Sequence, residues 1–268
     1  MHKSRLLAIF TLREIIAQPI YRTLCALAFV FILAALILSK LFLFETGKVL
    51  VDLIWLSMGL ISLIYVLFIA CTMLAQDIGS QMVYLFIPLL RRDEYLKGRL
   101  AGLFLALTLL TFWMLLLATL AIAWNISSTV EIYHHGLTAW TALPLASISL
   151  LQAFAALALV AFVCSWATSQ AEMLVFSASF IVFSAIFPAI IEILQSPEVI
   201  ANTPNSIVIL IQGISFLFPK VSTSSFAIAQ AHGFSIPLSD WLALISSYLG
   251  YALLALTTAF FIFSRRDL

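Results

Sequence analysis

Six long apolar runs constrain this chain more than any other feature of its sequence. A membrane-spanning helix needs about 20 apolar residues, and the runs that meet this length are residues 23–44, 51–74, 100–124, 144–166, 173–194 and 241–263. Only 9% of the 268 residues are charged, against roughly a quarter in a soluble domain. The sequence therefore predicts an all-α, polytopic membrane protein in which residues 23–268 form one six-span domain.

Residues 1–22 precede the first span and are predicted to form an amphipathic helix at the membrane interface. At about 100° per residue, one face of this helix is polar and the other is mostly apolar. The polar face contains Lys3, Ser4, Thr11, Glu14 and Gln18, and the apolar face contains Leu6, Ile9, Leu12, Ile15 and Ile16.

A seventh apolar run, residues 207–218, is too short to cross a bilayer. It follows the polar stretch 196–206 and ends before Pro219 and Lys220. We expect a re-entrant or interfacial segment on the outer side, before the last span. A loop helix packed against the bundle is the alternative.

Basic residues are unevenly divided between the two sides that six spans would define. With both chain ends on one side, that side holds ten Lys and Arg residues, and the other holds only Lys40, Lys48 and Lys220. Basic residues accumulate on the cytoplasmic side of membrane proteins. The pattern predicts cytoplasmic termini, a cytoplasmic 75–99 segment and a location in the plasma membrane, a bacterial inner membrane in our interpretation.

Several functional classes lack support in the sequence. Spans 100–124 and 241–263 contain no Asp, Glu, His, Lys or Arg, whereas ion-coupled carriers place ionisable groups at membrane depth. The chain has no G-x-x-x-x-G-K-[ST] phosphate loop and no H-E-x-x-H or G-x-S-x-G motif. We expect no enzymatic activity, cofactor or metal site in this chain. We interpret the pair His134-His135 as part of a solvated loop, because adjacent side chains diverge.

The segment 75–99 joins the second and third apolar runs and combines apolar, aromatic and basic residues. A polar, basic segment cannot lie in hydrocarbon, so we predict a cytoplasmic loop with a short surface helix, N-capped by Asp93. Two interpretations remain open from the residues alone. The loop either docks a cytoplasmic partner or lies on lipid headgroups. The net charge of +1 gives no indication of nucleic-acid binding.

The order of residues 77–102, D-I-G…P-L-L-R-R-D-E-Y-L-K-G-R-L-A-G, resembles the signature of type-2 ABC transporter permeases. In that family an acidic residue and Gly end span two, and a Leu-rich turn, Pro, Arg, an acidic–Tyr pair, Gly and a basic residue lead into span three. The corresponding positions are Asp77, Gly79, Leu85, Pro88, Arg92, Glu94, Tyr95, Gly98 and Arg99. Arg91 stands where a small residue is commoner, and Asp77 replaces a frequent Glu.

Weaker similarities extend to both chain ends. Residues 11–22 are similar to the interfacial helix of these permeases, and residues 263–268 resemble their short basic tail. Six spans and a re-entrant segment before the last also fit, so the resemblance covers the whole chain.

The resemblance implies a permease subunit of an exporter-type ATP-binding cassette complex. Two permeases, identical or paralogous, would associate with two cytoplasmic ATP-binding subunits that hold the ATP. The 75–99 loop would contain the coupling helix, with ATPase contacts at Leu89, Leu90, Arg91, Arg92, Asp93, Glu94 and Tyr95. The uncharged spans suit a hydrophobic or amphipathic substrate, or transmission of force to a periplasmic partner.

Two other functional classes remain open. One is a non-transporting membrane scaffold whose basic loop binds lipid, and the other is an ion-coupled secondary carrier. Co-purification with a P-loop ATPase would separate the permease from the scaffold. Sensitivity to a protonophore would identify the carrier.

Overall fold

The computed structural model describes residues 2–42, 45–79, 92–128, 137–194, 207, 223–234 and 236–265, and over these residues the ordered elements are helical. The first half contains α1 (His2–Ala17), α2 (Pro19–Ser39), α3 (Thr46–Tyr65), the π-helix η1 (Val66–Ala70), α4 (Cys71–Gly79) and α6 (Arg92–Ser128). The second half contains the 3-10 helix η3 (Ala139–Thr141), α7 (Ala142–Trp166), α8 (Gln170–Leu194), α11 (Thr223–Ala231) and α12 (Leu238–Arg265).

Five helical stretches are long and apolar enough to cross a membrane: Pro19–Ser39, Thr46–Asp77, Glu94–Ser128, Ala139–Trp166 and Leu238–Arg265. They confirm the prediction of an all-helical, multi-pass membrane protein. The predicted run 173–194 lies in α8, which is not among these five stretches. The sixth crossing therefore stays a prediction. The re-entrant segment 207–218 lies outside the described residues except for Ile207.

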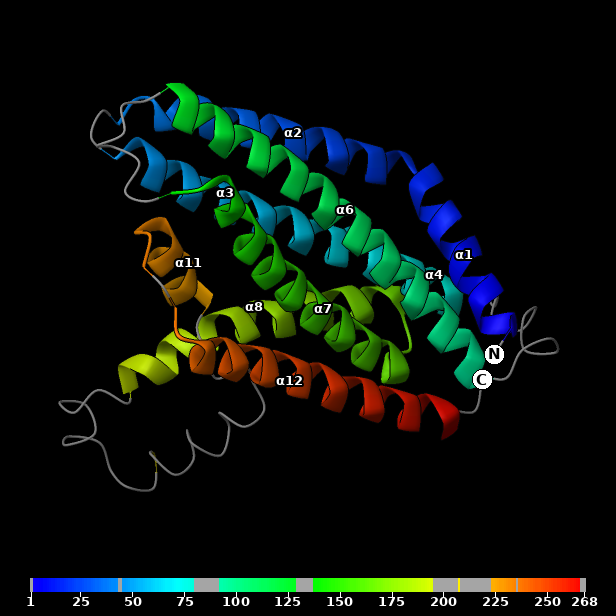
Figure 1. Cartoon of the computed structure of the whole chain (residues 1–268). Coiled ribbons are helices and arrows are strands. Elements are labelled where there is room, and N and C mark those ends of the chain that lie inside the picture. Colours follow the sequence, from blue (N-terminus) through cyan, green and yellow to red (C-terminus); the bar gives the residue numbers. More distant parts are fainter. Residues whose placement is uncertain are drawn as a thin grey trace.

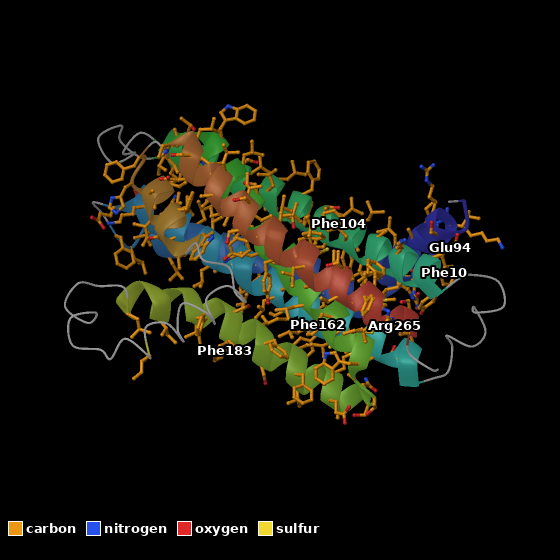
Figure 2. All side chains as sticks on the ribbon, turned by 90° about the horizontal axis from the view of Figure 1, so that it is seen from below. Phe10, Glu94, Phe104, Phe162, Phe183 and Arg265 are labelled. Carbon is orange, nitrogen blue, oxygen red and sulfur yellow. The ribbon has the colours of Figure 1, made fainter. Side chains whose placement is uncertain are left out.

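The long helices form one elongated bundle (Figure 1). Helix α1, the end of α4, the start of α6 and the end of α12 lie at one end of it, which we call the α1 end. The end of α2, the start of α3 and the short helix α11 lie at the opposite end. Figure 2 shows Phe10, Glu94 and Arg265 together at the α1 end. The basic residues of α1, of the start of α6 and of the end of α12 therefore gather at this end.

The chain changes direction between α1 and α2. Gln18 has an extended backbone conformation, and Pro19 is the first residue of α2. Proline has no backbone N–H and disfavours a helical conformation in the residue before it, which ends one helix and starts the next. The first span consequently begins at Pro19 and ends at Ser39, a few residues earlier than the predicted run 23–44.

Tyrosine side chains join the first helices to α6 inside the bundle. The hydroxyl of Tyr21 donates to the carbonyl of Ala106 at 3.1 Å, and that of Tyr65 donates to the carbonyl of Leu103 at 2.7 Å. The two rings also meet edge to face, with centroids 6.3 Å apart. Helix α6 is therefore bonded to both α2 and α3 at this level.

The helices on either side of the predicted 75–99 loop are longer than the sequence suggested. Helix α4 continues α3 through η1 and ends only at Gly79, and α6 begins at Arg92. Asp93, Glu94 and Tyr95 therefore lie in the first turn of α6, and the prediction of Asp93 as the N-cap of a separate surface helix is wrong. Leu89, Leu90 and Arg91 lie outside the described residues.

Candidate functional site

Five side chains from three helices meet at the α1 end of the bundle, and we call them the polar clasp. Asp77 lies two residues before the end of α4. Tyr95 and Arg99 are four residues apart near the start of α6, so they share one helix face. The other two members, Thr11 and Glu14, are three residues apart on α1. The clasp therefore joins α4 and α6 on either side of residues 80–91 and connects both to α1.

Asp77 and Arg99 form a two-pronged ion pair. The Nε of Arg99 lies 2.8 Å from Oδ2 of Asp77, and its Nη2 lies 2.8 Å from Oδ1. The Tyr95 hydroxyl donates a third hydrogen bond to Oδ2, at 2.5 Å. Bidentate pairing between a guanidinium and a carboxylate is strong and fixes the orientation of both groups. The pair holds the end of α4 against the start of α6.

Arg99 also binds α1 through its third nitrogen. Its Nη1 donates to Oε2 of Glu14 at 2.6 Å and to Oγ1 of Thr11 at 3.1 Å. The side chains of Arg99 and Asp77 are 6% and 7% exposed, whereas that of Glu14 is 38% exposed. Arg99 and Asp77 are therefore largely removed from solvent, and each depends on the other for charge compensation.

Two glycines let α1 approach α6 closely enough for these bonds. A Cβ added at Gly98 would lie 2.9 Å from the carbonyl oxygen of Ser4, and one at Gly102 would lie 2.5 Å from Cβ of Thr11. Both distances are too short for a real side chain, so only glycine fits. The spacing is G-x-x-x-G, the pattern that permits close helix–helix contact in membranes.

The buried face of α1 differs from the expected one. Thr11 and Glu14 belong to the predicted polar face, yet Thr11 is fully buried and both side chains bind Arg99. Leu6 and Ile9 of the predicted apolar face are exposed on the bundle surface, whereas Ile15 is buried. The polar face turns inward because a buried guanidinium requires acceptors.

The predicted ATPase contacts differ in their exposure to solvent. Tyr95 is 4% exposed and hydrogen-bonded to Asp77, so its side chain packs within the bundle and not on its surface. Glu94 is partly exposed, and the backbone of Arg92 and Asp93 lies in the first turn of α6. Sequence reasoning missed the role of Thr11, Glu14 and Arg99 in one cluster. The G-x-x-x-G spacing at residues 98–102 was a signal that could have indicated it.

The clasp is suited to holding helices together and moving them as a unit. Within the described ranges, no group of three or more His, Cys, Asp or Glu residues could hold a metal ion. A further contact at this end places the Lys97 ammonium 5.6 Å from the ring centre of Phe260, which connects α6 to α12.

Comparison of the chain with protein-family models and with curated proteins gives no match.

Proposed function

We propose that this chain is the membrane subunit of an exporter-type ATP-binding cassette complex, driven by a separate cytoplasmic ATPase through residues 75–99. The observation that carries the proposal is the polar clasp. Three residues of the motif on which the resemblance rests belong to the clasp: Asp77, Tyr95 and Arg99. A fourth motif residue, Gly98, lies where α1 and α6 cross closely beside the clasp. A motif whose separated residues meet in one buried cluster has a structural role at the ends of residues 80–91.

The clasp holds the end of α4 against the start of α6, and these are the two helix ends that residues 80–91 join in the sequence. A force on this segment would act on α4 and α6 together, because the Asp77–Arg99 pair joins them. Helix α6 has 37 residues, which corresponds to a length of about 55 Å at 1.5 Å per residue. A displacement at the α1 end would thus reach the opposite end of the bundle without new contacts forming on the way.

The complete assembly in this proposal contains two permeases and two ATPase subunits in the bacterial inner membrane. Both chain termini and residues 80–91 face the cytoplasm, where the basic residues of the α1 end would obey the positive-inside rule. Helix α8 supplies the sixth crossing. The cargo is hydrophobic or amphipathic, or the stroke acts on a periplasmic partner.

Co-purification from native membranes tests this proposal. A tagged chain should bring down a P-loop ATPase, and Arg91→Glu with Arg92→Glu should reduce its recovery by at least about tenfold, because reversed charges at a contact repel the partner. The matched control reverses the same number of charges at the opposite end, with Lys40→Glu and Lys48→Glu, and should leave recovery unchanged. Mass spectrometry of the eluate measures both.

The two rival classes predict different results, one in this experiment and one in a transport assay. A lipid-binding scaffold would bring down no ATPase, and its membrane association would follow the content of anionic headgroups. An ion-coupled carrier would lose its transport activity when a protonophore is added and would keep this activity when ATP is depleted. Either result would refute the permease proposal.

A further inference from the structure

A cavity of about 320 Å³ lies among α3, α7, α8 and α12, away from the polar clasp. This volume is at the lower end of the range for small-molecule sites. Its lining residues Gly59, Gln152 and Tyr251 lie near the middle of the apolar stretches Thr46–Asp77, Ala139–Trp166 and Leu238–Arg265. The cavity is therefore close to the midplane of the membrane that these helices would span.

Polar but uncharged side chains converge on this cavity. The hydroxyls of Ser62 and Ser149 lie 3.3 Å apart across the contact between α3 and α7. Gln152, Tyr248 and Tyr251 add further polar groups to the lining. Polar side chains are costly at membrane depth and commonly mark a functional site there. Since none of the described lining residues is charged, a charged ligand would remain uncompensated in this environment.

The cavity opens toward the lipid-facing surface of the bundle. Leu56 and Leu60 of α3 contribute to its lining and are 61% and 43% exposed. Gly59 lies between them, and a Cβ added at this position would meet no atom within 4 Å. The space beside Gly59 is therefore empty and is accessible from the side where acyl chains would lie.

We propose that this cavity binds a neutral single-chain amphiphile drawn from the bilayer, whose uncharged head meets the polar groups of the lining. The alkyl chain of the ligand would pack on the apolar lining of α3 and α7, and its hydroxyl or ester head would meet the serine, glutamine and tyrosine groups. This binding site is additional to the proposed ATPase drive and does not depend on it. Monoacylglycerols and fatty alcohols have the required chemistry.

Photolabelling of the purified full chain in phosphatidylcholine nanodiscs tests this site without any ATPase. The probe is a monoacylglycerol with a diazirine on its alkyl chain. Labelling should saturate, compete with unlabelled monoacylglycerol and map to lining residues of α3 and α7. Gly59→Phe places a ring in the cavity and should reduce labelling by at least about tenfold, since the volume is too small for both. Tyr251→Phe should weaken binding about two- to tenfold by removing one hydroxyl from the lining.

The matched control is Gly250→Phe on α12. Gly250 is exposed and a Cβ there would also meet nothing within 4 Å, so this variant adds the same ring outside the cavity and should leave labelling unchanged. Thermal unfolding of each variant verifies that it folds, and Tyr251→Phe decides the question if Gly59→Phe does not fold. Labelling that does not saturate, that spreads to exposed residues such as Phe112 and Leu120 of α6, or that is unchanged in both Gly59→Phe and Tyr251→Phe would indicate bulk lipid only and overturn the proposal.

Discussion

Replacing Arg99 with Met is expected to destabilise the protein by about 3–5 kcal/mol, the cost of leaving one member of a buried ion pair without its partner. The Met side chain retains much of the apolar stem of Arg99 but offers nothing to the Asp77 carboxylate, whose side chain is 7% exposed. Thr11, Glu14 and Tyr95 lose a shared partner at the same time. Thermal unfolding in nanodiscs, followed by circular dichroism, measures the loss.

Two further variants identify charge compensation as the cause. Glu14→Gln should cost less than about 1 kcal/mol, because Glu14 is 38% exposed and its ion pair is partly solvated. Arg99→Met combined with Asp77→Asn should recover part of the stability that Arg99→Met loses, because the uncompensated carboxylate is gone. Equal losses in Glu14→Gln and Arg99→Met, or no recovery in the double variant, would contradict this account of the clasp.

Substitution of Gly102 by Ala is expected to cost about 1–3 kcal/mol through overpacking at the crossing of α1 and α6. The new Cβ would lie 2.5 Å from Cβ of Thr11 and 2.8 Å from the carbonyl oxygen of Ala8, which belongs to the backbone and cannot rotate away. The two helices must therefore separate, which lengthens the bonds from Arg99 to Thr11 and Glu14. Thermal unfolding should show the loss, and Gly102→Leu should show a larger one.

Gly250→Ala is the control for this prediction. It makes the same substitution in a helix where the new Cβ would meet nothing within 4 Å. Its stability should be unchanged or slightly higher, because Ala is the better helix former. If Gly102→Ala and Gly250→Ala behaved alike, the close crossing of α1 and α6 would have no energetic importance.

The sequence predicted the membrane helices well because their signal is local. A run of about 20 apolar residues has few alternatives to a helix in lipid. The five helical stretches that are long and apolar enough to cross a membrane overlap the predicted runs. The boundaries near the α1 end were predicted less well. Asp77 and Arg99 each indicate an extramembrane position when considered alone, but they neutralise one another across 22 residues of sequence, so that α4 and α6 extend past them.

The remaining features depend on contacts that no local pattern encodes. The inward turn of Thr11 and Glu14 follows from the position of Arg99, which is far away in the sequence. The cavity beside Gly59 exists because four helices pack around it. Helix α11 packs against α3 at the end of the bundle opposite the clasp, and the sequence analysis predicted no helix over residues 223–231.

Photo-crosslinking from position 90 in native membranes tests the central claim most directly. A benzoylphenylalanine replacing Leu90 places the probe among the residues expected to contact the ATPase. One replacing the exposed Leu41, which lies two residues after the end of α2, places it at the opposite end of the bundle. We expect Leu90→benzoylphenylalanine to form an adduct with a P-loop ATPase and Leu41→benzoylphenylalanine to form none. An adduct confined to lipid, or an ATPase adduct from position 41 and not from position 90, would contradict the account.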